Sequence, residues 1–519
     1  MRTILLALLS SLAAAVAWAR TPAEFPGLDE NWSRYESPHF ELYSAISEST
    51  SRGLLEQLEM LRAVLMARMK LTEVQPVPVT LFCYKSQSDF ENCLPAEDHD
   101  HERTVSFWSN QSDRCIMLIA PGESEELRNF AGLQFVEYLF TISDRKPARW
   151  YLTGLCQLYG NADLGRKSVE LGVGIPGWAT DLRLHGLFPL DRFFGFDNGS
   201  QTLQGATSLT TYCAQAWLLM HYCEFGRRTL PKEKLQAFLA AVSDERMQRD
   251  FEGMRRACRE TLGCDYPELQ EDLHKYLLRG EFPSIDVPRP DLEPRSSYAR
   301  RPAPAAEMRA RLAEVVFRLD RSPRGRLALL QALDHEPVEA RVYEVLGNDG
   351  AMHGDEKEAR ERWAQALEAK SGNPAVIRTY ADLEVRRWFR GFDLYFQLPP
   401  ARAEEYRELL HRSLRLAPRQ TGAYELLAWV ESSAPSPDAA NVAEIERQLP
   451  TLQHPAQIQI ALALVHFHAR DYAGVRARLA ALEAMHPDAA EQKAAGILLA
   501  ETARREAEPV TDADRAGSN

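Results

Sequence analysis

The chain has 519 residues, a length typical of roughly two to four domains. Hydrophobic residues make up 45% of it and charged residues 26%, which are the proportions of a globular protein with enough apolar side chains for a core. The formal net charge of −13 argues against nucleic acid as a partner, because binding to phosphates requires a basic surface.

Residues 1–19 have the three parts of a secretory signal peptide. Arg2 supplies the positive charge, Ile4–Val16 forms a short apolar run, and the segment that ends at Ala19 fits the small-x-small cleavage rule. We therefore expect cleavage after Ala19 and a periplasmic or secreted mature protein. The apolar run is too short to cross a bilayer comfortably, and no later segment is long and apolar enough, so we expect no transmembrane segment after cleavage.

All eight cysteines lie between residues 83 and 264. An even number of cysteines in an exported chain is compatible with disulfide bonds. Cys258 and Cys264 flank a predicted helix end and turn and form the best local pair. Cys93 and Cys115 flank a polar loop and form the next best pair. Three other cysteines are predicted to be reduced and hydrophobe-like, and these are Cys156, Cys213 and Cys223.

Residues 20–280 are predicted to form an α+β domain in which strands come first and helices follow. Alternation of apolar and polar residues predicts strands, and apolar residues three and four positions apart predict an amphipathic helix. The predicted strands are 38–44, 77–84, 104–108, 115–120 and 167–172, and the predicted helix is 54–69.

Residues 281–304 contain six prolines and are predicted to be a linker, or an extended strap, because proline is poorly tolerated inside helices and strands. Residues 305–505 are predicted to be helical. Prolines that follow predicted helix ends recur there in a pattern similar to degenerate tetratricopeptide repeats, which use about 34 residues per helix pair. A plain helical bundle is the alternative. The longest interval contains an aromatic-rich insertion, Trp388–Pro400, and residues 506–519 are predicted to be a disordered tail. The recurring prolines are Pro337, Pro374, Pro418, Pro455 and Pro487.

Two neighbouring segments carry the most information about function. The first is Val136–Phe140, with the sequence Val-Glu-Tyr-Leu-Phe, and the second is Pro147–Tyr159, which contains Trp150 and Gly154. Together they resemble the metal-binding helices of the peptidase-MA-like gluzincins, in which a pattern like H-E-Y-x-H precedes P-x-W-x-x-E-G-x-A-E-Y. In such a site two histidines one helical turn apart and a glutamate from the second helix bind zinc. The glutamate beside the first histidine activates the zinc-bound water.

The polar residues of that pattern are mostly replaced in this chain. The resemblance places Val136 and Phe140 where the two histidines belong, and Thr153 where the zinc-binding glutamate belongs. Gln157 stands where the family often has another glutamate, and Glu137 keeps the position of the general base. Valine and phenylalanine offer no lone pair and threonine is a poor neutral ligand, so zinc binding is not expected.

The resemblance extends from about Trp32 to Leu278 in the expected order, and it implies a zincin-like fold for the first domain. It is also carried by the opening strands, by the turn Leu171–Pro176, and by the helix Thr211–Tyr222. Within that helix Tyr212 matches a family position that often points into the cleft.

Other candidate sites are weaker. Asp98–Glu102 is dense in metal-ligand types, but His99 and His101 have a spacing that suits a strand or a charged, solvated loop rather than a helix face. His221 lies in an apolar helix and is predicted to be a partly buried histidine with its hydrogen bonds satisfied. Cys156 lies in mid-helix among apolar neighbours, which is a poor setting for a reactive thiolate.

The leading hypothesis is an exported, catalytically inactive relative of a zinc peptidase, without a cofactor. It would bind a protein or peptide through the former cleft and the helical repeats. One alternative is a hydrolase with a rearranged active site that uses Glu137 with Tyr212, or the loop with His99 and His101. In another alternative the first domain is a structural platform and the repeats are the functional half.

Overall fold

In the computed structural model the chain forms two compact units, and the boundary between them lies between Pro337 and Val338. The short segment Glu73–Val77 is grouped with the second unit. Within the described ranges, no helix combines the length and apolarity needed to cross a membrane. The predicted signal peptide, the Asp98–Glu102 loop and most of the predicted tail lie outside the described residues. The structure describes residues 25–507 except 75–76, 95–105, 111–112, 121–134, 144–146, 166, 197–205, 227–230, 242–250, 321–322, 335–337, 390, 453–454 and 486.

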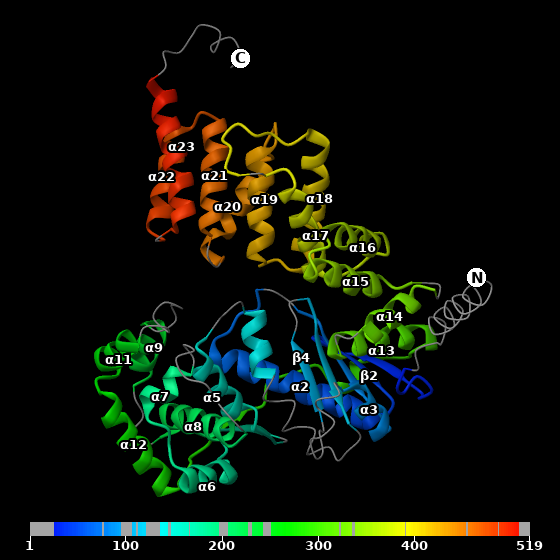
Figure 1. Cartoon of the computed structure of the whole chain (residues 1–519), viewed down its shortest axis with the longest axis vertical. Coiled ribbons are helices and arrows are strands. Elements are labelled where there is room, and N and C mark those ends of the chain that lie inside the picture. Colours follow the sequence, from blue (N-terminus) through cyan, green and yellow to red (C-terminus); the bar gives the residue numbers. More distant parts are fainter. Residues whose placement is uncertain are drawn as a thin grey trace, which may run out of the picture. The chain divides into compact units, whose positions relative to one another are not determined.

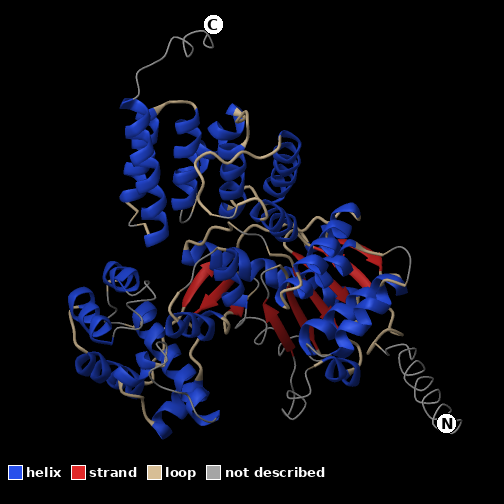
Figure 2. Ribbon diagram, turned by 45° about the horizontal axis from the view of Figure 1, so that its top comes forward, coloured by secondary structure: helices blue, strands red, loops and turns tan. Residues whose placement is uncertain are grey.

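The N-terminal unit is built around a six-stranded mixed sheet with the order β4-β5-β3-β2-β1-β9 (Figure 2). Strands β2, β3 and β5 are parallel, and the other pairs are antiparallel. Leu42, Leu81 and Met117 lie in register across the three parallel strands and are buried, as expected of central parallel strands. The strands are β1 (Ser33–Glu36), β2 (Phe40–Ser44), β3 (Val79–Cys83), β4 (Ser106–Asn110), β5 (Cys115–Ile119) and β9 (Ala299–Pro302).

Helix α2 (Glu48–Met69) contacts β2 and is the first long helix among the described residues. It begins after Ser47, whose hydroxyl accepts a hydrogen bond from the backbone of Thr50, and ends at Lys70 in the left-handed conformation. One face of the helix is buried, which fits the predicted spacing of its apolar residues. The buried residues of that face include Leu54, Leu55, Leu58, Leu61, Val64 and Leu65.

Helices dominate the middle of the N-terminal unit, with α8 at their centre (Figure 1). Helix α8 packs against α5, α6, α9 and α12. A small antiparallel sheet with the order β6-β7-β8 belongs to the same unit. The elements are α3 (Gln87–Cys93), α5 (Arg149–Tyr159), β6 (Asp163–Leu164), β7 (Ser168–Leu171), α6 (Pro176–His185), α7 (Leu190–Gly195), α8 (Ala206–Phe225), α9 (Lys232–Ala241), α11 (Phe251–Ala257), a π-helical turn (Cys258–Leu262), α12 (Tyr266–Arg279) and β8 (Ile285–Pro288).

Residues 281–304 differ from a free linker, because they add one strand to each sheet. Strand β8 pairs with β7, and β9 pairs with β1. Both are edge strands, where proline is tolerated because one side of the strand needs no backbone donor. Pro288 and Pro302 are the last residues of these strands. Pro288 and Pro302 therefore lie in edge strands of the two sheets of the N-terminal unit.

The helices directly after that stretch group with the N-terminal unit, so the division between the two compact units falls at Pro337/Val338, whereas the sequence places the start of the repeat domain at residue 305. They are α13 (Ala305–Asp320) and α14 (Pro323–Ala332). The Tyr43 hydroxyl donates to the Glu307 carboxylate at 2.7 Å, and the Arg318 guanidinium contacts the Asp113 carboxylate at 2.7 Å. Buried polar contacts, which the helical periodicity does not reveal, thus assign α13 to the sheet unit.

The described part of the C-terminal unit is all helical, as predicted, while its assignment to tetratricopeptide repeats stays a prediction. Helices α17, α19, α21 and α23 pack in succession, each against the next. The helices are α15 (Ala340–Met352), α16 (Glu356–Glu368), α17 (Pro374–Arg386), α18 (Pro400–Leu416), α19 (Thr421–Ser433), α20 (Ala439–Gln448), a 3-10 turn (Leu449–Thr451), α21 (Ala456–His468), α22 (Tyr472–Glu483) and α23 (Ala489–Ala507).

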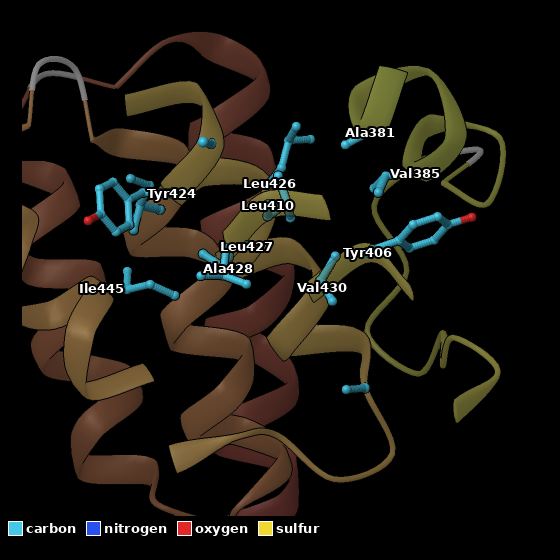
Figure 3. Close-up of a cluster of buried hydrophobic side chains, with 14 of the residues drawn as sticks. Ala381, Val385, Tyr406, Leu410, Tyr424, Leu426, Leu427, Ala428, Val430 and Ile445 are labelled. Atoms are coloured by element: carbon cyan, nitrogen blue, oxygen red, sulfur yellow. The ribbon is translucent and has the colours of Figure 1, made fainter. Parts of the chain in front are cut away.

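Helix α19 is the centre of the largest hydrophobic cluster described in this unit (Figure 3). Leu426 lies toward Val385 of α17, whereas Tyr424 lies toward Ile445 of α20. Because α19 is apolar on several sides, its neighbours on both sides can pack against it. This packing fixes the faces of α17, α19 and α21 that form the pocket described below.

Candidate functional site

The positions that match the zinc-binding histidines hold core side chains. Residues 135–142 are helical, and Val136 and Phe140 lie one turn apart on its buried side, with 0% and 6% of their surfaces exposed. Glu137 is exposed. On α5, Thr153 and Gln157 are both half-buried and also lie one turn apart. Two apolar side chains and a threonine therefore occupy the positions that the resemblance assigns to ligands.

Trp150 and Gly154, which match the gluzincin pattern in the resemblance, hold α5 in place. Trp150 is 1% exposed, and its ring centroid lies 5.3 Å from that of Phe194. A Cβ atom on Gly154 would lie 2.4 Å from Cγ of Met220 and 2.6 Å from the carbonyl oxygen of Ala216. Gly154 thus permits the close crossing of α5 and α8 (Figure 1). These two residues have a structural role that needs no catalysis.

Gly154→Ala is therefore expected to destabilise the N-terminal unit by about 1–3 kcal/mol, because the added methyl group meets backbone that cannot move aside. Gly53→Ala is the matched control, since Gly53 lies in α2 and a Cβ atom there would have no neighbour within 4 Å. That change should stabilise the unit by about 0.5–1 kcal/mol. Midpoints of denaturant unfolding provide the comparison, and equal effects of the two changes would show that α5 and α8 do not cross closely.

The Cys156 thiol, which interacts with Glu137, and the Cys213 thiol, which interacts with Cys156, are poor nucleophiles at neutral pH. Burial raises the pKa of the Cys156 thiol to about 12, and the charge of Glu137 contributes to this shift. Burial likewise raises the pKa of Cys213. Partial desolvation raises the pKa of Glu137 itself. Both thiols therefore stay protonated, which fits the prediction that Cys156 is not a reactive thiolate.

Tyr212 lies in an aromatic layer. It is 1% exposed, and its ring centroid lies 5.0 Å from that of Phe193 and 5.5 Å from that of Phe196. A reaction on a dissolved peptide by Glu137 with Tyr212 would require this layer to open. The geometry thus gives the rearranged hydrolase no preformed pair.

The prediction that His221 is a histidine with its hydrogen bonds satisfied is confirmed, and the side chain is completely buried. One ring nitrogen lies 2.8 Å from the Tyr276 hydroxyl and the other 2.9 Å from the carbonyl oxygen of Gly172. Desolvation lowers the pKa of this imidazole. Both nitrogens are thus engaged in holding α8 against the turn after β7 and against α12.

The eight cysteines are free thiols in the structure, and the two disulfide pairings stay predictions. The Cys258 thiol donates to the carbonyl oxygen of Cys264 at 3.4 Å, so these residues are neighbours. A hydrogen bond between the two thiols lowers the pKa of Cys264 and raises that of Cys258. Cys93 is buried in α3, with its sulfur 3.1 Å from the Tyr84 hydroxyl. Among the described residues, no group of three or more histidines, cysteines or acids is placed to hold a metal ion.

The C-terminal unit contains a pocket that the sequence reasoning did not identify. Its volume is about 550 Å³, and α17, α19, α21, α23 and residues 387–399, here called the crossing loop, contribute to its lining. The crossing loop connects α17 to α18 and corresponds to the predicted aromatic insertion. The only sequence signal was the unusual length and aromatic content of that insertion.

The crossing loop is anchored on helices that follow it in the chain. The backbone of Leu398 donates to the carbonyl oxygen of Ser433 in α19 at 2.8 Å. The ring of His468 in α21 donates to the carbonyl oxygen of Leu394 at 2.7 Å. The Tyr395 hydroxyl bonds to Glu501 of α23. The loop thus spans from α19 to α23 and forms a fixed wall of the pocket.

The walls of the pocket combine aromatic and acidic side chains. Phe389 and Phe392 of the crossing loop, Trp429 of α19 and Ile460 of α21 supply apolar surface. The Phe389 and Trp429 ring centroids lie 5.9 Å apart. Apolar walls with a few polar groups are typical of binding pockets, and the volume falls in the range of about 300–1,000 Å³ for such sites. The acidic lining residues are Asp382, Asp393, Glu425 and Glu491.

No family model matches the chain, no curated protein matches it, and no solved structure matches it. The gluzincin resemblance therefore rests on the residues of the two segments and their order along the chain.

Proposed function

We propose that the chain is an exported, non-catalytic relative of a gluzincin peptidase that binds a peptide segment of a partner protein. The pocket between the crossing loop and helices α17, α19, α21 and α23 is the proposed binding site. The observation that carries this proposal is a formed pocket of about 550 Å³ with aromatic and acidic walls.

The residues that match the gluzincin zinc site support the proposal that the chain does not catalyse peptide cleavage. Val136 and Phe140 are core residues, and Trp150 and Gly154 have a packing role. A fold can keep such a framework after its chemistry is lost, because the framework stabilises the domain independently of the metal. The protonated Cys156 and the buried Tyr212 offer Glu137 no activated partner.

The position of the pocket between stacked helices supports the proposal that it binds a peptide. Stacked helices present broad grooves that take extended or helical peptides. Aromatic side chains in such a groove bury much apolar surface at a low entropy cost, which makes them frequent binding anchors. Trp429 projects from a rigid helix, and Phe389 is packed against it. The pocket thus has anchors whose positions are fixed before a ligand binds.

The test uses the full chain with an array of synthetic 12-residue peptides of varied sequence. Ala490→Trp fills the mouth of the pocket, since Ala490 is exposed and lines it. Ala500→Trp is the matched control, as Ala500 is an exposed residue of α23 outside the pocket lining. Wild type and the control should bind the same subset of peptides, and Ala490→Trp should bind that subset about tenfold more weakly or worse.

The recovered peptides should have unchanged masses. Cleavage of the bound peptides, or equal binding by Ala490→Trp and wild type, would contradict the proposed function. The unfolding midpoint of each variant, measured by circular dichroism, shows whether the variants are folded in the assay.

A further inference from the structure

The pocket carries an excess of negative charge. Asp382, Asp393, Glu425 and Glu491 line it, while Arg386 is the only arginine or lysine among the described lining residues. A concave site with this balance concentrates cations, because its walls focus the field into the cavity. The charge alone does not define a ligand, but the hydrogen bonds and ion pairs of each carboxylate indicate which one is available to a ligand.

Three of the four carboxylates have partners within the protein. Asp382 forms an ion pair with Arg386 at 2.8 Å. Glu491 accepts a hydrogen bond from the Gln457 side chain at 3.0 Å. Asp393 accepts one from the Tyr395 backbone at 3.0 Å. These groups are engaged in the local structure of α17, α23 and the crossing loop.

Glu425 differs from the other three. It is half-buried, and its carboxylate forms no hydrogen bond or ion pair with any other residue in the described part of the chain. The charges that act on it are Asp382 and Glu491, which repel, and Arg378 and Arg386, which attract. Burial, followed by the repulsion from Asp382, raises the pKa of Glu425. A carboxylate in this setting gains more than the others from a cation that enters the pocket.

Trp429, the neighbour of Glu425 on α19, indicates which kind of cationic group fits the pocket. Trp429 lies one turn further along α19 and also lines the pocket, so the two side chains lie on one face. A lysine or arginine side chain has an apolar stem and a charged end, and it can lay the stem along an indole ring while its charge meets a carboxylate. The apolar walls formed by Phe392 and Ile460 suit an apolar neighbour in the same peptide.

We propose, on the basis of the proposed function, that the pocket recognises an apolar peptide segment with one lysine or arginine. The cationic end of that side chain pairs with Glu425, and its stem contacts Trp429. Glu425 is thus the residue that selects the charge of the ligand, and the aromatic walls supply affinity that does not depend on charge.

The test measures binding of three peptides to the full chain by isothermal titration calorimetry. The probe is acetyl-Ala-Leu-Lys-Phe-Ala-amide, and two further peptides replace its lysine with norleucine or glutamate. Wild type should prefer the lysine peptide to the norleucine peptide by about tenfold or more, the contribution of a charged hydrogen bond, and should bind the glutamate peptide least. In Glu425→Gln this preference should shrink to about twofold or less, with the norleucine peptide bound as before.

Glu408→Gln is the matched control, because Glu408 is an exposed acid of α18 outside the pocket lining. It should keep the wild-type preference. Equal binding of the lysine and norleucine peptides by wild type, with Ala490→Trp still blocking both, would overturn the charge selection and leave the binding function standing. An unchanged preference in Glu425→Gln would overturn the role of Glu425. Failure of every peptide in this assay and in the array would overturn the proposed function itself.

Discussion

The combined substitution of Val136→His, Phe140→His and Thr153→Glu is expected to give a chain that binds about one zinc ion, where the wild type binds none. The first two positions lie one turn apart on one side of the helix formed by residues 135–142. The charge of Glu137 acts on the Cys156 thiol of α5, which indicates that α5 lies close to that helix. If the two segments keep the gluzincin arrangement, the three new side chains converge and Glu137 stands beside the metal.

Zinc content after desalting, measured by mass spectrometry, is the readout. Two buried imidazoles should destabilise the metal-free variant, and zinc should raise its melting temperature, because the ion binds the folded state. The chain with Val136→His and Phe140→His alone is the control and should bind zinc much more weakly, since it lacks the third ligand. A folded triple variant without zinc would show that these segments do not have the gluzincin geometry.

A fragment that ends at residue 304 is expected to lose cooperative unfolding, whereas a fragment that ends at Pro337 keeps it. The reason is the contact of α13 with the sheet. Arg318 is 5% exposed and contacts the Asp113 carboxylate at 3.1 and 2.7 Å and that of Glu314 at 2.8 Å. Loss of α13 removes this guanidinium together with the buried apolar side chains of the helix. Each such side chain contributes about 1.5–3 kcal/mol by its burial, so their combined loss is a large part of the usual stability of a domain.

Arg318→Met tests the same contact in the full chain and should cost about 3–5 kcal/mol, which is measured by denaturant unfolding. Arg386→Met is the control, because its pair with Asp382 is exposed on the arginine side and should contribute less than about 0.5 kcal/mol. The assignment of α13 to the N-terminal unit would be wrong if the shorter fragment unfolded with the same midpoint as the longer one.

The sequence predicted the central strands β2, β3 and β5 of the N-terminal sheet, because side-chain alternation is a local property, but it did not predict β1 or β9. The predicted strand 77–84 contains β3 (Val79–Cys83), and the predicted strand 115–120 contains β5 (Cys115–Ile119). The proline-rich stretch was harder to interpret, since proline excludes strand interiors but not strand edges. Pairing of β8 with β7 joins residues more than 100 positions apart, which a local pattern does not contain.

The candidate sites show the same division between local and distant information. The helical spacing predicted that Val136 and Phe140 share a face, and in the structure both are buried. The pocket brings together Asp382, Glu425 and Glu491 from three helices. Nothing in the sequence near any one of these acids indicates that the others are close, so this site required the packing of the helices.

The wild-type chain, incubated with excess zinc and desalted, is expected to hold far less than one zinc ion per chain, because Val136, Phe140 and Thr153 stand at the positions that the gluzincin resemblance assigns to the ligands. Elemental mass spectrometry of the purified mature protein measures this directly. A content near one ion per chain, together with cleavage of the bound peptides that is lost in Glu137→Ala, would contradict the central claim that this protein binds peptides without zinc-dependent cleavage.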